Sequence, residues 1–535
     1  MSQQSVKSVL LAILCAASAA FAQVTVVANN VGYEKTGTKR AVVQSASAIA
    51  ATEAQLVNAG GTVVHTIALG PQQTVAQWSG PAFRFFKVAD FTPFTTDGDG
   101  YRVRVGTAES FPFSIGEKIL QTKTGADQVA FFNGMRNTDP RDRNLPIFGS
   151  TPTRTHNIYG GWWDATGDPG KHLSHLAYSN YLTPQQIPMV VWALLHAMEL
   201  QPDVYGTAAR SETAWGADYL LRALAPGGYF YMSVFDNWGD EYRWQSADAQ
   251  GPGTRGPREI CAWGTWEGRT ASDIDNTFNG DGLRTADYQS AMREGAGVSI
   301  ASLARAAKAG ISGDSSAAQY LAGAKRAYAH LKENPTRYQF NNRQNIIDYY
   351  CGLLAASELY HATNEQEYRD EAREWADKLL GLQTDDGWFY SGPNAAGDLY
   401  RPFHHAAEEG FPVVALWRYY YTAAASSDKQ RILDAVRKNL LHYRKITYEA
   451  SNPFEYAKMY RAVPVDGGGP TVVDLALGKP ATASRSEGSF TPEKAFAAGT
   501  TNDSRWSSFQ AGAQNDSQWI AVDLGQGIQD RQGRP

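Results

Sequence analysis

The chain has 535 residues, of which 43% are hydrophobic, and this is enough for several domains with packed cores. Its 49 lysine and arginine residues against 54 aspartate and glutamate residues leave a formal net charge of -5. Because no overall positive field attracts phosphate backbones, we expect no nucleic-acid partner.

Residues 1–22 have the three-part layout of a cleavable secretory signal. Lys7 is followed by an apolar run over 9–19, and Ala-Phe-Ala at 20–22 supplies the small residues of a cleavage site. We therefore expect secretion to the periplasm or the extracellular space, with a mature chain that begins near Gln23. No later stretch is long and apolar enough to predict a membrane span.

Residues 23–117 are predicted to form a β-sandwich. Short apolar runs alternate with Gly, Asp, Thr and Pro, for example RAVVQ at 40–44, TVVHTIAL at 62–69, FRFFKV at 83–88 and YRVRVG at 101–106. Six or seven such strands over about ninety residues are typical of a β-sandwich.

Residues 118–462 are predicted to form an all-α domain. Apolar residues recur there at three- and four-residue steps, which indicates amphipathic helices. The expected helices lie near 124–137, 184–200, 212–224, 289–310, 315–334, 345–363, 364–383, 408–424 and 426–447. The stretch between 226 and 285 is the longest connection, and connections of that size usually form a binding surface.

A glycine-rich stretch at 463–473 is predicted to be a linker, and residues 474–535 a second β module. This tail ends in the strand-like QWIAVDLG at 518–525.

The segment GGWWDATGDPGKH at 160–172 carries the chemistry that the sequence indicates most directly. Asp164 and Asp168 are carboxylates that can activate a water molecule, and Trp162 and Trp163 offer indole faces against which a sugar ring stacks. The alternative is an Asp-rich turn whose carboxylates accept local backbone N–H groups, with both indoles in the core.

These residues also resemble a known family. GGWWDATGDPGKH is similar to the catalytic segment of glycoside hydrolase family 9, the cellulases, and ETAWGADYLLRAL at 212–224 resembles the helix that follows it. NNVGYEKTGTKRAVV at 29–43 resembles the immunoglobulin-like domain that precedes the family's catalytic module. The resemblance implies an (α/α)6 barrel of twelve helices and inverting hydrolysis of β-1,4-glucan.

In that family both aspartates hold the attacking water, and the second is the general base, which here corresponds to Asp168. Thr166 is inserted between the two aspartates relative to the family pattern, which leaves the register of Asp164 open.

An inverting glycosidase also needs a carboxylic acid roughly 6.5–9.5 Å from the base. The candidates are Glu408 and Glu409, just before a helix that Pro412 is expected to begin. Acidic residues are also favoured at a helix N-terminus without any catalytic purpose. The family's usual Asn-Glu-Val-Ala motif is not found in the sequence, and nine predicted helices are fewer than twelve. An incomplete barrel is therefore a second interpretation.

Further side chains near this helix are candidates for sugar binding. Arg401, His404 and His405 could hydrogen-bond hydroxyl groups, or the histidines could be surface groups at a helix start.

No cofactor is expected. Asp273, Asp275 and Asp281 hint at a structural calcium site, but the segment fails the EF-hand pattern because Phe278 occupies the glycine position. The last two cysteines, Cys261 and Cys351, either form a disulfide or, as we expect, behave as small buried hydrophobes.

The tail, with LALGKPATAS at 475–484, RWSS at 505–508 and QWIAVDLG at 518–525, resembles the opening of a coagulation-factor 5/8 type C (discoidin-like) domain, which in hydrolases often binds carbohydrate. Only about sixty residues of that domain are present.

Together these features predict a secreted, monomeric glycoside hydrolase that acts on β-1,4-glucan. One alternative is a carbohydrate-binding protein that has lost its general acid. Another is the same fold acting on β-glucosaminides, another β-glucan or hemicellulose.

Overall fold

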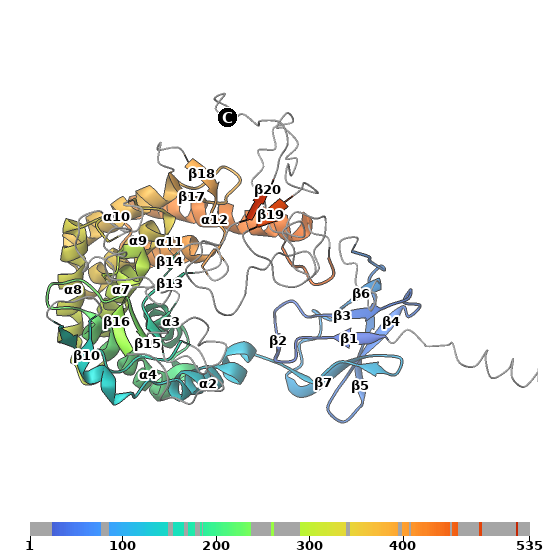
Figure 1. Ribbon diagram of the computed structural model, residues 1–535. Coiled ribbons are helices and arrows are strands. Elements are labelled where there is room, and N and C mark those ends of the chain that lie inside the picture. The colour runs from blue at the N-terminus through green and yellow to red at the C-terminus, as the bar shows by residue number, and fades with distance from the viewer. Residues whose placement is uncertain are drawn as a thin grey trace, which may run out of the picture.

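The computed structural model describes the residues 24–75, 85–147, 153–164, 170–176, 182–183, 186–236, 258–261, 289–338, 343–393, 399–405, 408–449, 452–457, 481–483 and 520–522. They form a β-sandwich, a helical domain and two short strands of the tail (Figure 1). The predicted signal, the linker and the three calcium candidates lie outside the described residues.

The N-terminal domain consists of two sheets, as predicted. One sheet has the order β1 (Thr25–Val27), β3 (Arg40–Ser45), β6 (Phe85–Asp90). The other has the order β2 (Gly32–Glu34), β9 (Phe113–Gly116), β7 (Gly98–Val105), β4 (Glu53–Val57), β5 (Val63–Ala68), with β8 (Ala108–Glu109) beside β7. In β7 every second side chain from Tyr101 to Val105 is buried, which gives the sheet one face for the core and one for solvent.

The helical domain contains a helix at each of the nine predicted positions. These helices are α2 (Ile119–Gly134), α3 (Ile187–Leu200), α4 (Pro202–Ala223), α7 (Ala296–Lys308), α8 (Ala317–Glu333), α9 (Ile346–Thr363), α10 (Gln366–Leu380), α11 (Phe411–Thr422) and α12 (Ser426–Glu449). Two of the turns between them are set by capping boxes, at Ser316 before α8 and at Asn345 before α9.

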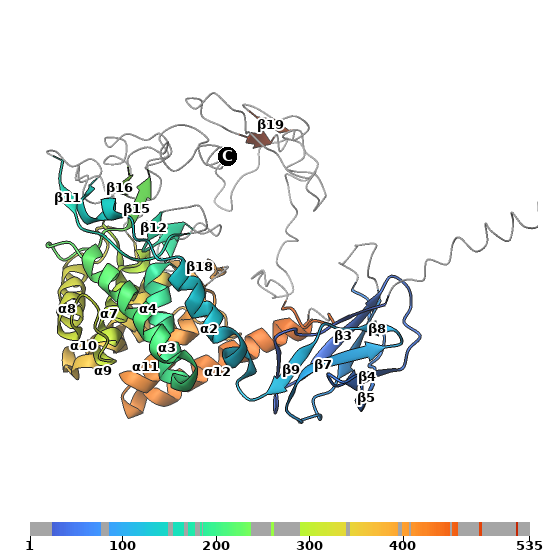
Figure 2. The same cartoon turned by 90° about the horizontal axis from the view of Figure 1, so that it is seen from below.

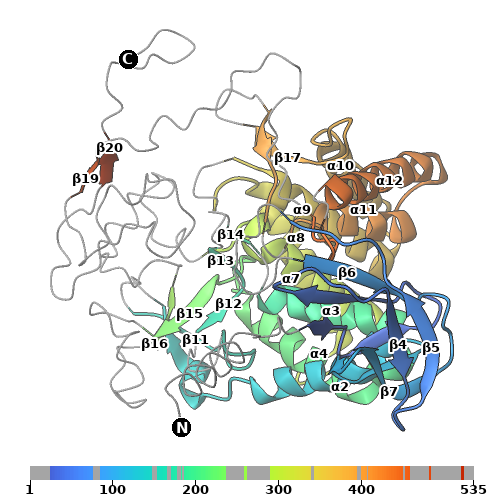
Figure 3. The same ribbon diagram turned by 90° about the vertical axis from the view of Figure 1, so that its right-hand side faces the viewer.

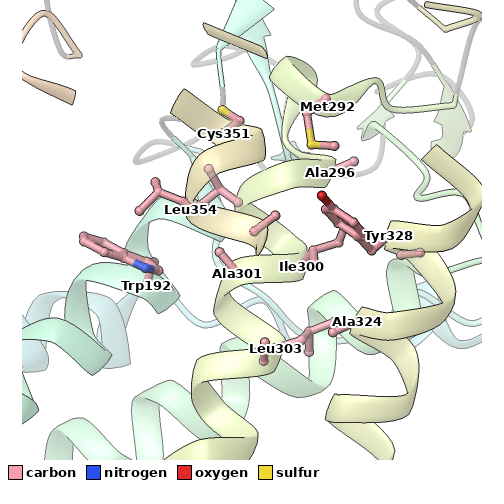
Figure 4. Packing of buried hydrophobic residues seen from close by; sticks show 14 of the residues in the cluster. Trp192, Met292, Ala296, Ile300, Ala301, Leu303, Ala324, Tyr328, Cys351 and Leu354 are labelled. Atoms are coloured by element: carbon pink, nitrogen blue, oxygen red, sulfur yellow. The ribbon is translucent and has the colours of Figure 1, made fainter. Parts of the chain in front are cut away.

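Four of these helices form an inner row. Short turns join α3 to α4, α7 to α8, α9 to α10 and α11 to α12, so each pair is an antiparallel hairpin. Contacts run from α3 to α7, from α7 to α9 and from α9 to α11, and these inner helices therefore point the same way. Figure 4 shows Ile300 and Leu303 of α7 on the side of α8, and Ala301 on the side of Leu354 in α9.

The long stretches of chain all lead into the N-terminal ends of the inner helices. They span 135–186 before α3, 224–295 before α7, 334–345 before α9 and 381–410 before α11. A small antiparallel sheet lies at this end, in the order β12 (Lys171–His172), β15 (Ser233–Asp236), β16 (Arg258–Cys261). The hairpin β17 (Tyr390–Pro393) and β18 (Leu399–Pro402) precedes α11. Figures 2 and 3 show these strands beyond one end of the helices, and we call this end the loop face.

Several contacts join the two domains. The Glu34 carboxylate of the sandwich accepts the backbone N–H of Lys118 at 2.9 Å and of Ile119 at 2.7 Å, and so caps the first turn of α2. This cap explains why α2 begins five residues before the predicted position. Near the end of the helical domain, Arg40 pairs with Glu455.

Other predictions concern the cysteines, the membrane and the tail. Cys351 is a free and fully buried thiol, so the disulfide alternative is wrong and Cys351 packs as a small hydrophobe. None of the helices in the described part of the chain could cross a membrane. In the tail, β19 (Ala481–Ala483) pairs antiparallel with β20 (Ile520–Val522), which lies within the strand-like segment predicted there.

Candidate active site

The predicted catalytic segment lies on the loop face, and both ends of its central loop are fixed. The backbone N–H of Asp164 donates to the carbonyl of Gly170 at 2.9 Å, so the two ends of the predicted loop over 165–169 lie side by side. The N–H of Trp163 donates to the carbonyl of Met135 at 3.0 Å. Asp164 is half-buried at the base of this loop, whereas Asp168 and Thr166 lie outside the described residues.

Lys171 holds the two chain segments beside the loop together. Its ammonium group is fully buried and donates to the carbonyls of Ile158 at 2.5 Å and Gly160 at 3.0 Å. It also pairs with the Asp142 carboxylate at 2.6 Å. Burial lowers the pKa of Lys171 to about 7, because the loss of hydration outweighs the attraction of Asp142. The segments before and after the loop are therefore joined through one side chain.

Asp142 is the centre of this arrangement, which we call the clamp: Asp142, Lys171 and Arg258. Arg258 lies on β16 and donates to both carboxylate oxygens of Asp142, at 2.6 and 3.0 Å. Burial opposes ionisation of Asp142, but the two cations hold its pKa below the usual range. The clamp thus ties the loop to the sheet that contains β12, β15 and β16.

The two tryptophans before the loop have different environments. Gly160 and Gly161 have φ values of 100° and 75°, and this left-handed backbone turns the chain so that Trp162 points inward. Trp162 is only 3% exposed and packs against Phe132, so the prediction that it lines a sugar site is wrong. Trp163 is 40% exposed and is the indole with a face open to solvent.

The two candidate acids, Glu408 and Glu409, also differ in their exposure to solvent. Glu408 is 1% exposed and accepts a hydrogen bond from the hydroxyl of Tyr350 in α9. Its backbone N–H donates to Nδ1 of His405 at 3.0 Å. His405 is itself 4% exposed, and its ring stacks on Phe403. Glu408 and His405 therefore belong to the packing under the start of α11, and the expectation that His405 lines the sugar site is wrong.

Glu409 lies on a cavity of about 310 Å³ at the loop face. Its carboxylate contacts Nδ1 of His404 at 3.2 Å and is hydrogen-bonded to Tyr443 of α12. Burial and the neighbouring Glu409 raise the pKa of Tyr443, so its hydroxyl stays protonated and donates to the carboxylate. The side chain of Arg401 lies outside the described residues. The cavity is lined by Trp388, Phe389, Pro402, Phe403, His404, Glu409, Asn439, His442, Tyr443, Ile446 and Ala457.

Asp142, Arg258 and Tyr443 are site residues that the sequence did not indicate. Asp142 lies in PRDRN, a polar stretch like many surface turns, and its partner Arg258 is more than a hundred residues away. Lys171 was part of the family pattern, but its contacts depend on the fold. Within the described ranges no group of three or more His, Cys, Asp or Glu side chains could hold a metal ion.

The fold and the site together indicate the class of protein. A β-sandwich precedes a helical domain whose inner helices begin at one face, and that face carries carboxylates and aromatic side chains, as in polysaccharide-cleaving enzymes. The model of glycosyl hydrolase family 9 matches residues 123–459, which is more than half of the chain, and the cellulase N-terminal ig-like domain matches residues 22–110. The chain belongs to glycosyl hydrolase family 9, with the family's (α/α)6 type of catalytic domain. Both matches end before the tail.

Solved structures share this fold at low sequence identity. A Bacteroides ovatus family 9 protein has 17% identity and a TM-score of 0.54, over 81% of this chain and 75% of that chain. A thermostable endoglucanase from Alicyclobacillus acidocaldarius has 17% identity and a TM-score of 0.52, over 81% and 73%. A metagenome-derived family 9 endoglucanase has 20% identity and a TM-score of 0.50, over 80% and 74%. A search of the curated proteins found no match.

Proposed function

We propose that this family 9 enzyme hydrolyses β-1,4-linked glucan with inversion at the anomeric carbon. Asp168 acts as the general base, and Asp164 helps to hold the water molecule. Trp163 stacks on a sugar ring next to the bond that breaks. The observation that supports the proposal is the buried clamp, because Lys171 joins the chain just before Asp164 to the chain just after Gly170 on the loop face.

Of the two candidate acids we assign the role to Glu409. A general acid must reach the oxygen of the leaving group, and Glu409 has a side chain 37% exposed on a cavity. Glu408 is buried beneath Tyr350 and cannot reach a substrate in this arrangement. His404 beside Glu409 contributes a ring nitrogen that can hydrogen-bond a sugar hydroxyl.

The test is release of reducing sugar from amorphous cellulose by the purified protein. We expect Asp168→Ala and Glu409→Gln to abolish release, since each removes one proton-transfer group, while Glu408→Gln, where it folds, retains it. Proton NMR of the first product should show the α-anomer. Early β-anomer would contradict inversion.

A second candidate is a carbohydrate-binding protein without cleavage. It is favoured by the environment of the candidate acids, because Tyr350 engages Glu408 and both Tyr443 and His404 engage Glu409. Binding to cellulose without sugar release by the unmodified protein would establish it. The remaining alternative is the same chemistry on another sugar. Measuring sugar release from a panel of β-linked glucans, hemicelluloses and glucosaminides distinguishes it from hydrolysis of β-1,4-glucan.

Secretion and the role of the tail are further proposals. The layout of residues 1–22 supports export, and N-terminal sequencing of the protein from culture fluid should begin near Gln23. The discoidin-like pattern of residues 474–535 supports carbohydrate binding by the tail. Removing these residues should then weaken retention on cellulose without changing the cleavage of short soluble glucans.

A further inference from the structure

A second cavity, of about 660 Å³, lies away from the predicted catalytic loop. It is bordered by α3, the end of α9, α11 and α12, and we call it the α3–α11 groove. Its volume falls in the range of about 300–1,000 Å³ that is usual for small-ligand sites. The groove is lined by Trp192, His196, Glu199, Leu200, His361, Val413, Val414, Trp417, Arg418, Tyr421, Thr422, Val436 and Leu440.

The rim of the groove carries exposed aromatic side chains on the last turns of α11. Trp417 is 38% exposed and Tyr421 is 63% exposed. The indole of Trp417 is stacked on the ring of Tyr420, with 5.3 Å between centroids and 7° between planes, which holds it in one orientation. Rigid, solvent-facing aromatic rings are surfaces on which the C–H faces of a pyranose can stack.

Two side chains at the floor of the groove, Glu199 and Arg418, belong to a network of ionic side chains whose charges balance. Arg418 donates to both oxygens of the buried Glu358, at 2.8 and 2.9 Å, and to Glu199 at 2.9 Å. Arg305 pairs with the same two carboxylates. Two guanidinium groups thus face two carboxylates. The floor is polar and held in place, but it carries no net charge, which suits a neutral ligand rather than an ion.

The two histidines beside this network, His196 and His361, do not change its net charge near neutral pH. Nη2 of Arg305 donates to Nδ1 of His196 at 2.9 Å, so His196 is neutral with its proton on Nε2. Burial and the two arginines lower the pKa of His196 to about 4. Burial also lowers the pKa of His361 on the neighbouring wall. Both rings therefore stay uncharged. His196 presents only its Nε2–H donor to the groove, because Arg305 occupies its acceptor nitrogen.

The exposed part of Glu199 indicates which kind of ligand fits the groove. Its side chain is 47% exposed at the mouth of the groove, although two arginines fix the position of its carboxylate. A carboxylate has about four lone-pair sites, so it can still accept hydrogen bonds from a ligand. A sugar hydroxyl supplies such a donor, whereas an apolar helix that covered the groove would remove the exposed part of Glu199 from water without replacing its hydrogen bonds.

We propose that the α3–α11 groove is a second, non-catalytic binding site for a neutral gluco-oligosaccharide, with Trp417 and Tyr421 as the stacking surface and Glu199 as an acceptor for sugar hydroxyls. The site holds a stretch of polysaccharide away from the loop face. The inference rests on the proposed function for the identity of the sugar, and it deepens that function by giving the enzyme a second point of attachment to the same polymer.

The test uses the full chain with Asp168→Ala as background, so that the polymer is not consumed. Binding to amorphous cellulose and to cellohexaose is measured for this protein and after adding Trp417→Ala or Tyr421→Ala. We expect each groove substitution to weaken binding about fivefold to tenfold. Tyr448→Ala is the matched control, because Tyr448 is 60% exposed on α12 outside the groove, and it should leave binding unchanged.

The groove variants are also made in the active protein. Cleavage of cellotriose should remain as in the unmodified enzyme, because a short substrate occupies only the loop face. Tyr421 is so exposed that Tyr421→Ala should fold even where Trp417→Ala does not. Unchanged cellulose binding in both variants overturns the inference. So does a dimer that Tyr421→Ala dissociates, since the groove would then be covered by a second copy. Failure of the proposed function appears separately, as absence of sugar release by the unmodified protein.

Discussion

The clamp behind the predicted catalytic loop gives the sharpest prediction. In Lys171→Met the apolar stem is preserved and the ammonium group is removed. The carbonyls of Ile158 and Gly160 then lose their buried donor, and an unsatisfied buried group costs about 1–3 kcal/mol. Part of this loss is offset, because the desolvated ammonium no longer has to be buried. Asp142 keeps both hydrogen bonds from Arg258. We therefore expect the free energy of unfolding to fall by about 2–4 kcal/mol.

A protein of ordinary stability survives this loss, so the variant should be folded at 25 °C. Its loop should nevertheless be less precisely held, and a misplacement near 1 Å costs on the order of a hundredfold in rate. We expect kcat for cellulose to fall at least about tenfold. Hydrogen exchange of the amides of Asp164 and Leu173 should accelerate, which provides a measurement that does not depend on activity.

The matched control is Asp218→Asn. Asp218 is also a buried carboxylate, but it accepts the backbone N–H groups of Asp314 and Ser315 and the hydroxyl of Tyr320 at the turn between α7 and α8, away from the loop face. The free energy of unfolding of Asp218→Asn should fall by a similar amount, while its kcat stays within about twofold of the unmodified protein. The reasoning is refuted if folded Lys171→Met keeps the kcat of this control and the two amides exchange no faster than in the unmodified protein.

Three further predictions concern stability. Glu34→Ala removes the cap from the first turn of α2 and should cost about 1–2 kcal/mol in denaturant unfolding, whereas a cost near zero would show that water replaces the carboxylate. Gly216→Ala places a Cβ 2.4 Å from the Trp162 ring and should cost about 1–3 kcal/mol, with a shift in tryptophan fluorescence. The native pKa of His196 lies below its unfolded value, so native protein binds fewer protons between about pH 6.5 and 4 and loses stability as the pH falls through this window. His196→Asn should flatten the melting temperature against pH in that window, and a curve parallel to that of the unmodified protein would mean that the acceptor role toward Arg305 is unimportant.

The sequence predicted those parts of the fold that local patterns determine. Each helix shows its apolar period within one or two dozen residues, and the start of α11 is marked by Pro412 in its first turn. The start of α2 was misplaced because its cap is Glu34, more than eighty residues earlier in the chain. A cap from another domain leaves no trace in the neighbouring sequence.

The candidate site was predictable only to the level of a segment. Trp162 and Trp163 have the same chemistry and adjacent positions, yet the backbone of Gly160 and Gly161 sends one ring into the core and leaves the other partly exposed. Which of two neighbouring side chains is buried depends on what packs against them, and here that is Phe132 of α2. Such a choice is made by tertiary contacts, which a motif does not contain.

Glu408 and Glu409 are a second pair of neighbouring residues that tertiary contacts distinguish, and here the difference affects function. Burial excludes Glu408 from substrate contact, so of the two predicted acids only Glu409 can serve the proposed inverting mechanism. Glu409→Gln keeps the acceptor oxygen that Tyr443 uses and changes a partly exposed group, so it should leave stability within about 0.5 kcal/mol. The inner helices and the clamp do not involve Glu409. A protein that lost this one acid would therefore fold and bind glucan as before, so enzyme and binding protein can be separated only by measuring cleavage.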